Sequence, residues 1–333
     1  MEKITVLGAG SWGTALAVLL ARSGQDVTLW VRRPGLAETL RSQRVNHDYL
    51  PGISIPENLL PVSDLAVALA GASWIVSAIP SHGVRAILTE ARRSVESGAQ
   101  IVSTTKGLET ETLLRMSQVI AEVLSGRSIR GVAALSGPSF AIETAQGQPT
   151  AVVVASEDPQ LAASAQRLFS TGAFRVYTNS DLVGVEVGGA VKNVIAIASG
   201  VLLGLGLGQN SLAALITRGL AEVGRLGVAC GARPETFGGL AGLGDLVLTC
   251  TGQLSRNRSL GISIGQGLDL AAATSQTRMV AEGVLTTRAT VALAEKLQVE
   301  MPITQQMYEV LYKGKSPTEG IASLLERKLK EEF

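Results

Sequence analysis

Two hydrophobic patterns divide the chain near residue 180. Through residues 1–180, short β-prone runs alternate with stretches of helical periodicity. From about residue 179 the β pattern disappears, and long helical periodicities follow over residues 183–203, 212–226 and 286–296. Alternation of the first kind is typical of an open, largely parallel sheet with helices on both faces. We therefore predict a doubly wound, Rossmann-type α/β domain over residues 1–180 and an all-α domain over residues 181–333.

The first three predicted elements form a βαβ unit. A β-prone run at residues 3–7 is followed by a helical stretch at 14–21, a stop at Gly24 and a second strand at 26–31. Later strands are expected at residues 74–79, 100–104, 132–135, 151–155 and 175–177.

A glycine-rich turn joins the first strand to the first helix. Gly8 would permit the tight turn, Gly10 would let the backbone approach a pyrophosphate, and Gly13 would bring helix and sheet together. An ordinary surface turn is the alternative, since the chain holds 37 glycines. The surrounding βαβ unit favours a dinucleotide site, with the pyrophosphate at a helix N-terminus.

The end of the second strand indicates which dinucleotide binds. A free ribose 2′-hydroxyl is usually held there by an acidic residue, but this chain has Arg32 and Arg33 and no carboxylate at that point. Two guanidinium groups suit a 2′-phosphate, so we predict NADP(H), with NADH as a possible second cofactor. A solvated basic turn is the alternative.

Composition excludes several classes of protein. Of the 333 residues, 46% are hydrophobic and 17% charged, and a net charge of +1 gives no general attraction to nucleic acid or membranes. Two cysteines and two histidines suit neither a disulfide framework nor a histidine-rich metal site, and we predict no metal. The apolar run at residues 194–208 is shorter than the roughly 20 residues that span a bilayer. We expect that run to form a buried helix, and the protein, which lacks a secretory signal pattern, to be cytoplasmic.

Polar groups follow three predicted strands, at residues 80–82, 105–107 and 136–139. Ligands of such sheets bind beyond the carboxyl ends of the strands, so these groups should converge. Lys192 lies farther along, in an apolar, glycine-rich helix. Burial would lower its pKa toward the working pH and suit it to general acid–base catalysis. The alternative is a lysine that reaches solvent past its apolar stem.

Five sequence blocks carry a family resemblance, at residues 8–15, 105–109, 136–141, 188–193 and 242–251, and residues 255–258 and 301–304 extend it. Together they resemble the bacterial, soluble, NAD(P)-dependent glycerol-3-phosphate dehydrogenases over nearly the whole chain. The resemblance implies a C-terminal domain like that of 6-phosphogluconate dehydrogenases. It also implies reversible hydride transfer between the nicotinamide and dihydroxyacetone phosphate, giving sn-glycerol 3-phosphate for phospholipid synthesis.

The resemblance also assigns roles to residues. Lys192 matches the family's proton acceptor, Lys106 a second lysine that contacts substrate and cofactor, and Asp245 a carboxylate that orients Lys192. The implied substrate-binding residues are Lys106, Gly137, Ser139, Lys192, Asp245, Ser255, Arg256 and Asn257. The implied cofactor-binding residues include the glycines and arginines described above. The full set is Gly8, Gly10, Ser11, Trp12, Gly13, Arg32, Arg33, Lys106, Ala141, Arg256, Val280 and Glu282.

Simpler structural roles exist for several of these residues. Asp245 could cap a helix ahead of an apolar run, residues 255–257 could form an exposed polar loop, and Trp12 could pack in the core. His82 is assigned to a loop beside the cofactor rather than to catalysis.

Two other functions fit parts of the pattern. A β-hydroxy acid dehydrogenase would share the two-domain plan and a catalytic lysine, but would not need phosphate donors. A non-catalytic NADP(H) sensor would leave the two lysines and Asp245 unexplained. A homodimer is expected, since twofold assemblies are the commonest among soluble enzymes.

Overall fold

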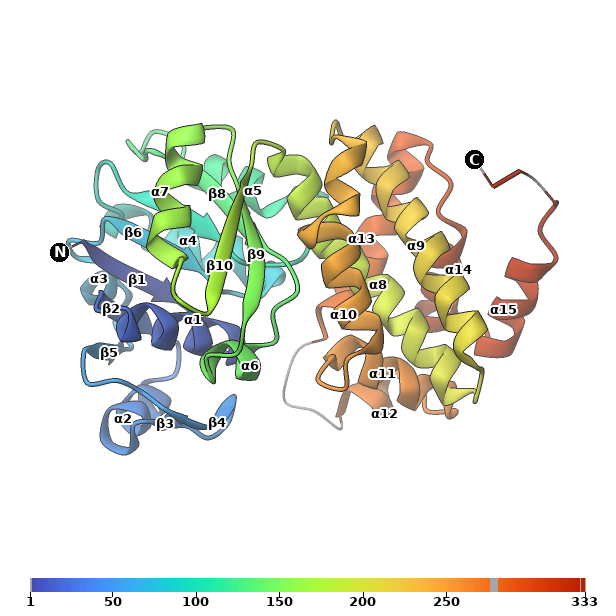
Figure 1. Ribbon diagram of the computed structural model, residues 1–333, viewed down its shortest axis with the longest axis horizontal. Coiled ribbons are helices and arrows are strands. Elements are labelled where there is room, and N and C mark those ends of the chain that lie inside the picture. Colours follow the sequence, from blue (N-terminus) through green and yellow to red (C-terminus); the bar gives the residue numbers. More distant parts are fainter. Residues whose placement is uncertain (1, 276–280, 330, 333) are drawn as a thin grey trace.

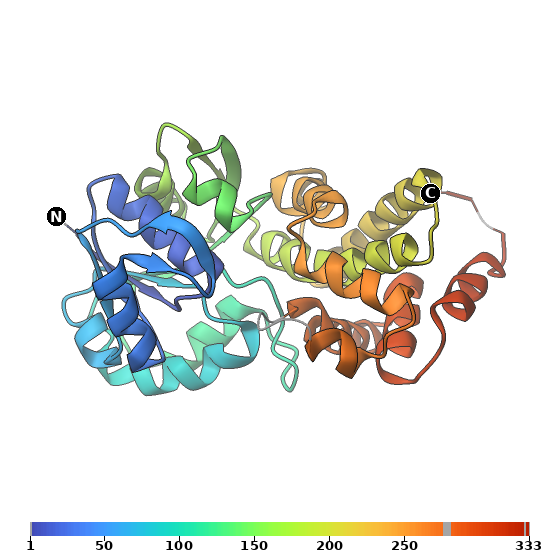
Figure 2. The same cartoon turned by 90° about the horizontal axis from the view of Figure 1, so that it is seen from below.

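The computed structural model describes residues 2–275, 281–329 and 331–332. It has two lobes side by side, an α/β lobe that contains the N-terminus and a helical lobe that contains the C-terminus (Figure 1). Seen from below, the lobes remain distinct (Figure 2). The last strand ends at Asn179 and the first helix of the second lobe begins at Leu182. The predicted fold class, a Rossmann-type sheet followed by a helical domain, is confirmed.

An eight-stranded sheet forms the centre of the α/β lobe. Its strands pair in parallel except for β8 and β9, which are antiparallel, so the sheet is mixed at one end. In sheet order the strands are β10 (Phe174–Asn179), β9 (Thr150–Ala155), β8 (Gly131–Ser136), β7 (Gln100–Ser103), β6 (Trp74–Ser77), β1 (Lys3–Leu7), β2 (Asp26–Trp30) and β5 (Leu59–Val62). The edge strand β5 and the hairpin of β3 (Val45–Asn46) and β4 (Leu50–Ser54) were not predicted.

Helices cover both faces of the sheet, as the alternating pattern predicts. One face packs against α1 (Ser11–Arg22), α2 (Pro34–Gln43), α6 (Ala141–Ala145) and α7 (Pro159–Phe169). The other packs against α3 (Leu65–Leu69), α4 (Val84–Ala91) and α5 (Met116–Val123). Strand residues buried on both faces explain why these strands read as continuous apolar runs.

The helical lobe is built around one buried helix, α8 (Leu182–Gly204). Packed against it are α9 (Gln209–Ala229), α10 (Asp245–Thr251), α11 (Arg256–Gly265), α13 (Glu282–Leu297) and α14 (Pro302–Tyr312). The short helix α12 (Leu270–Ser275) packs against α11, and α15 (Pro317–Leu325) packs against α14. Among the described residues, α8 alone is long and apolar enough to cross a membrane, but 89% of its apolar window is buried inside the protein. The expectation of a buried helix over residues 194–208 is confirmed for its first part only, because α8 ends at Gly204 and Leu203 and Leu207 are exposed.

Glycines bring α8 and α11 into backbone contact. A Cβ at Gly200 would lie 2.0 Å from the carbonyl oxygen of Arg258, and one at Gly261 would lie 2.0 Å from that of Ile197. One turn on, a Cβ at Gly204 would lie 2.4 Å from the carbonyl oxygen of Ile262, and one at Gly265 would lie 2.5 Å from that of Val201. This crossing places the start of α11, which carries residues 255–257, beside the middle of α8.

Candidate active site

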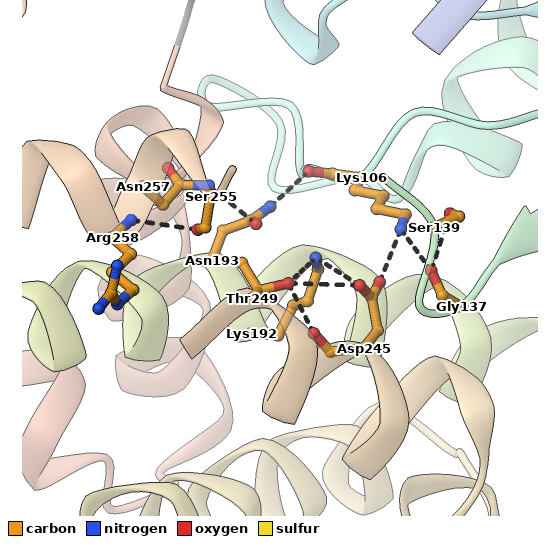
Figure 3. Close-up of polar contacts among 10 residues, drawn as sticks. All are labelled: Lys106, Gly137, Ser139, Lys192, Asn193, Asp245, Thr249, Ser255, Asn257 and Arg258. Carbon is orange, nitrogen blue, oxygen red and sulfur yellow. Dashed lines mark hydrogen bonds and ion pairs between the residues drawn. The ribbon is translucent and has the colours of Figure 1, made fainter. Parts of the chain in front are cut away.

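Two lysines from different lobes meet at one carboxylate. Lys106 follows β7, Lys192 lies in α8, and Asp245 is the first residue of α10. Lys192 Nζ donates to Asp245 Oδ1 and Lys106 Nζ to Asp245 Oδ2, each at 2.7 Å (Figure 3). The Asp245 side chain is 2% exposed and that of Lys192 7%, so Lys192 does not extend into solvent. The capping alternative for Asp245 is wrong, because both its carboxylate oxygens accept from lysines and the residue before the helix is Gly244.

Backbone and hydroxyl oxygens complete the surroundings of the two ammonium groups. Lys106 Nζ also donates to Gly137 O at 3.0 Å, and Lys192 Nζ to Thr249 Oγ1 at 2.6 Å. Thr249 donates in turn to Asp245 O at 2.6 Å. An ammonium has three N–H donors, so each lysine has two assigned among the described residues and one left to offer a substrate oxygen.

Burial and the neighbouring charges act in opposite directions on the pKa values of Lys192 and Asp245. Burial and the nearby charge of Lys106 lower the pKa of Lys192 to about 8, although Asp245 acts to raise it. Burial acts to raise the pKa of Asp245, but the two lysines outweigh it and hold that pKa below its usual value. The cluster therefore contains a carboxylate whose ionised form is favoured and a lysine whose pKa is lowered to about 8, a combination suited to proton transfer.

A second polar group joins α8 to α11. Asn257 Nδ2 donates to Asn193 Oδ1 at 3.0 Å, and Asn193 Nδ2 donates to Lys106 O at 3.2 Å. Ser255 caps α11 by accepting from Arg258 N at 3.2 Å. Ser255 and Asn257 are buried and Arg256 is exposed, so residues 255–257 are not the exposed loop of the alternative interpretation. Through Asn257, this segment is hydrogen-bonded to Asn193, the residue that follows Lys192.

The strand-end expectation for residues 136–139 is also met. Ser139 Oγ donates to Gly137 O at 3.0 Å, the same oxygen that accepts from Lys106. Gly137 has φ of +136°, and a Cβ there would lie 2.9 Å from Val152 Cα, so both conformation and space require glycine.

The glycine turn at the start of α1 has the predicted geometry. Gly8 has φ of +109°, and a Cβ at Gly13 would lie 1.9 Å from Gly8 O, whereas a Cβ at Gly10 would meet no atom within 4 Å. Gly10 precedes Ser11, where α1 begins, so its open side lies beside the first N–H groups of that helix. This arrangement fits a pyrophosphate.

Other predicted cofactor residues lie around this turn. Trp12 packs against the core, and its buried Nε1 has no hydrogen-bond partner among the described residues. Ala141 begins α6 and also packs there. Val280 lies outside the described residues.

A carboxylate stands beside the predicted arginines, contrary to expectation. Asp48, in the hairpin of β3 and β4, pairs with Arg33 at 2.9 Å, and Arg33 also lies 5.8 Å from the ring centre of Tyr49. The expectation failed because Asp48 is distant in sequence from the end of β2. Arg32 is exposed.

Glu282 connects the two lobes. Its carboxylate accepts from Ser81 N at 3.2 Å and Ser81 Oγ at 2.8 Å. Burial raises the pKa of Glu282 against these hydrogen bonds and the charges of His82 and Arg256. The exposed His82 therefore lies beside a predicted cofactor residue, as its loop position suggests.

The sequence interpretation missed Thr249 and Asn193 as site residues. Both lie within the sequence blocks that carry the family resemblance. Their positions could have identified them, because Thr249 is one turn after Asp245 and Asn193 is adjacent to Lys192.

Comparison with known proteins assigns the family. Residues 3–162 match the model of the N-terminal domain of NAD-dependent glycerol-3-phosphate dehydrogenase, and residues 181–322 match that of its C-terminal domain. The chain belongs to the NAD-dependent glycerol-3-phosphate dehydrogenase family.

Individual relatives cover the whole chain. It is 54% identical over 331 residues to a glycerol-3-phosphate dehydrogenase of the NAD(P)+ class from Citrifermentans bemidjiense, covering 99% of each chain. A relative of the same name from Geobacter sulfurreducens is 53% identical with the same coverage. The crystal structure of glycerol-3-phosphate dehydrogenase from Coxiella burnetii superposes with a TM-score of 0.94 at 42% identity, covering 98% of this chain and 99% of that one.

Proposed function

We propose that the protein catalyses the reversible, NAD(P)H-dependent reduction of dihydroxyacetone phosphate to sn-glycerol 3-phosphate. The observation that carries this is the pair of lysines held on Asp245 beyond the carboxyl ends of β7 and β8. Membership of the family supports the choice of substrate, and the site chemistry supports the reaction type.

Lys192 is proposed as the acid and base. A reduced nicotinamide cofactor, when bound, would supply the hydride for the carbonyl carbon of the substrate, and negative charge would develop on the carbonyl oxygen. The Lys192 ammonium gives that oxygen a proton, and in the oxidative direction the neutral amine removes it. The Lys106 side chain is proposed to lie beside the same oxygen and to stabilise its negative charge electrostatically.

Asp245 and Thr249 orient the acid. With Asp245 Oδ1 and Thr249 Oγ1 both within 2.7 Å of Lys192 Nζ, the remaining N–H has a fixed direction. Such preorganisation contributes to the rate because the group needs no reorientation during proton transfer.

The substrate phosphate is proposed to bind at residues 255–257. The N-terminus of α11 and the guanidinium of Arg256 suit a dianion. Ser139 and Gly137, beside Lys106, are proposed to contact the rest of the substrate.

NADPH is proposed as the preferred cofactor, with NADH as a weaker one. Arg32 and Arg33 would hold the 2′-phosphate at the end of β2. Asp48 must release Arg33 for it to contribute fully, so Arg32 is the primary contact. The proposed pyrophosphate site lies at Gly8, Gly10, Ser11, Trp12 and Gly13, and Ala141, Val280 and Glu282 are proposed to complete the cofactor contacts.

A spectrophotometric assay tests the function. Purified protein with NADPH and dihydroxyacetone phosphate should show loss of NADPH absorbance and formation of sn-glycerol 3-phosphate, and NADH should replace NADPH less well. A β-hydroxy acid dehydrogenase would instead turn over an unphosphorylated hydroxy acid, and a sensor would bind NADPH without turnover.

The cellular setting is also proposed. We propose a cytoplasmic homodimer that supplies glycerophospholipid synthesis, with its domains divided at residue 180. Light scattering of the purified protein tests the dimer, and cell fractionation tests the location.

A further inference from the structure

Glu186 in α8 is a buried carboxylate whose hydrogen-bond partners all lie in the α/β lobe. It accepts from Ser117 N at 2.7 Å, from Ser117 Oγ at 2.6 Å and from the guanidinium of Arg115. The residue is 8% exposed, so solvent contributes little to these contacts. A buried carboxylate with three donors is a fixed junction, because losing any of them would leave a buried polar group unpaired.

The receiving side of this junction is the start of α5. Helix α5 begins at Met116, so the Ser117 N–H belongs to its first turn and has no partner within the helix. A carboxylate at this position also meets the positive end of the helix dipole. The helix's own Gln118 Oε1 accepts from Arg115 N at 3.0 Å, whereas the Ser117 N–H is capped from the other lobe.

Arg115 extends the junction to the loop that carries Lys106. Arg115 pairs with Leu108 as an isolated β-bridge, which closes the loop two residues after Lys106. Arg85 braces the same loop through two hydrogen bonds of 2.8 Å to Glu109. A displacement of Arg115 would therefore move the Lys106 backbone.

The face of α8 that carries Glu186 makes two more contacts, with Lys106 and with Ser136 at the end of β8. Asn193 donates to Lys106 O, and Gly189 lies so close that a Cβ there would be 2.7 Å from Ser136 Oγ and 3.6 Å from Lys106 Cγ. Glu186, Gly189 and Asn193 are spaced by three and four residues, as one helix face requires. Lys192 lies on the same helix, so these contacts of α8 set the position of Lys192 relative to Lys106.

We propose that Glu186 is a positioning residue for the reaction, holding the Lys106 loop in register with Lys192 so that both ammonium groups reach Asp245. This inference rests on the proposed function. Glu186 acts through the junction and contacts neither Lys106 nor Lys192. Loss of the junction should misplace the two lysines, and misplacement by about 1 Å costs about 100-fold in rate.

Glu222 provides a matched control for Glu186. It is a carboxylate of α9, 1% exposed, and caps α14 by accepting from Ile303 N at 2.6 Å and from Thr304 N and Oγ1 at 3.1 Å. Glu186→Gln and Glu222→Gln therefore make the same chemical change at two buried helix caps. Only the first cap joins the two lobes beside the lysines.

The experiment compares kcat, the KM for dihydroxyacetone phosphate, the Kd for NADPH, the pH profile and Tm for both variants and the wild type. We expect Glu186→Gln to lower kcat by about 10- to 100-fold and to displace the pH profile, with the Kd for NADPH within about twofold of wild type. Glu222→Gln should lower Tm but keep kcat within about twofold and leave the pH profile in place.

A milder variant covers the case in which Glu186→Gln does not fold. Ser117→Ala removes one donor and keeps the backbone N–H, and kcat should fall by about two- to fivefold with the same displacement of the pH profile. Wild-type kcat and pH profile in both folded variants, or an equal loss of kcat in Glu222→Gln, would overturn the positioning role. Absence of turnover in the wild type would instead reject the proposed function.

Discussion

Lys192 Nζ and Asp245 Oδ1 lie 2.7 Å apart inside the protein, and the other carboxylate oxygen of Asp245 is used by Lys106. One buried carboxylate thus balances two cations. This shared charge keeps Lys192 from losing its proton altogether in a desolvated site, and so keeps its pKa in the range where it can both give and take a proton.

Replacing Lys192 by methionine should abolish most of the turnover. Lys192→Met keeps the apolar stem and removes the proton donor, so we expect kcat to fall by about 10²- to 10⁴-fold with little change in the Kd for NADPH. Steady-state kinetics and a fluorescence titration of NADPH measure the two effects.

Lys315 provides the control. It donates to Gln306, Glu309 and Ser323 in α14 and α15, away from the site. Lys315→Met should affect Tm and not kcat. Near-normal kcat in Lys192→Met would remove Lys192 from the acid–base role.

The two directions of the reaction should respond oppositely to pH. The reduction needs the Lys192 ammonium, so its kcat should fall as pH rises through about 8, and the oxidation needs the neutral amine, so its kcat should rise there. Initial rates from pH 6 to 10 in both directions measure the two limbs. If kcat changed with pH in the same sense in both directions, a group other than Lys192 would carry the proton.

Asp245→Asn should move the pH-dependent changes in kcat for both the reduction and the oxidation to lower pH. The charge of Asp245 acts to raise the pKa of Lys192, so its removal should lower that pKa below 8 and reduce the fraction of ammonium at neutral pH. The reduction should slow at pH 7 and recover partly in acid. Thr249→Val is the control: it removes a hydrogen bond of Lys192 but no charge, and its limb should stay near pH 8 even if kcat falls. A limb that stays near pH 8 in Asp245→Asn would reject this electrostatic coupling.

The two arginines after β2 should govern cofactor preference. Arg32→Ala with Arg33→Ala should raise the KM for NADPH about 10-fold or more while changing that for NADH by less than about twofold, because only NADPH carries the 2′-phosphate. Arg41→Ala removes a neighbouring charge of α2 that pairs with Glu38, and should change neither constant. Equal losses for both cofactors would count against recognition of the 2′-phosphate.

Local patterns predicted the parts of the site that depend on short stretches of chain. The βαβ unit and the backbone geometry at Gly8, Gly10 and Gly13 followed from residues that are neighbours in sequence. The sharing of Asp245 by Lys106 and Lys192 did not, because three separate elements must pack before the side chains meet. Two other contacts, Arg33 with Asp48 and Ser81 with Glu282, depend on tertiary packing in the same way. The hydrophobic periodicity of the sequence does not predict them. The edge strand β5 was missed because its run of four residues includes Pro61 and is too short for alternation to be evident.

The glycine contact between α8 and α11 should be needed for both stability and substrate binding. Gly261→Ala would place a Cβ 2.0 Å from Ile197 O, so the helices must separate, at a cost of about 1–3 kcal/mol in the free energy of unfolding. Because α11 begins with the proposed phosphate site, the separation should also raise the KM for dihydroxyacetone phosphate while leaving the Kd for NADPH near wild type. Denaturant unfolding and steady-state kinetics measure these changes. Gly238→Ala, where an added Cβ meets no atom within 4 Å, should change neither quantity, and a wild-type KM in a destabilised Gly261→Ala would separate the helix contact from substrate binding.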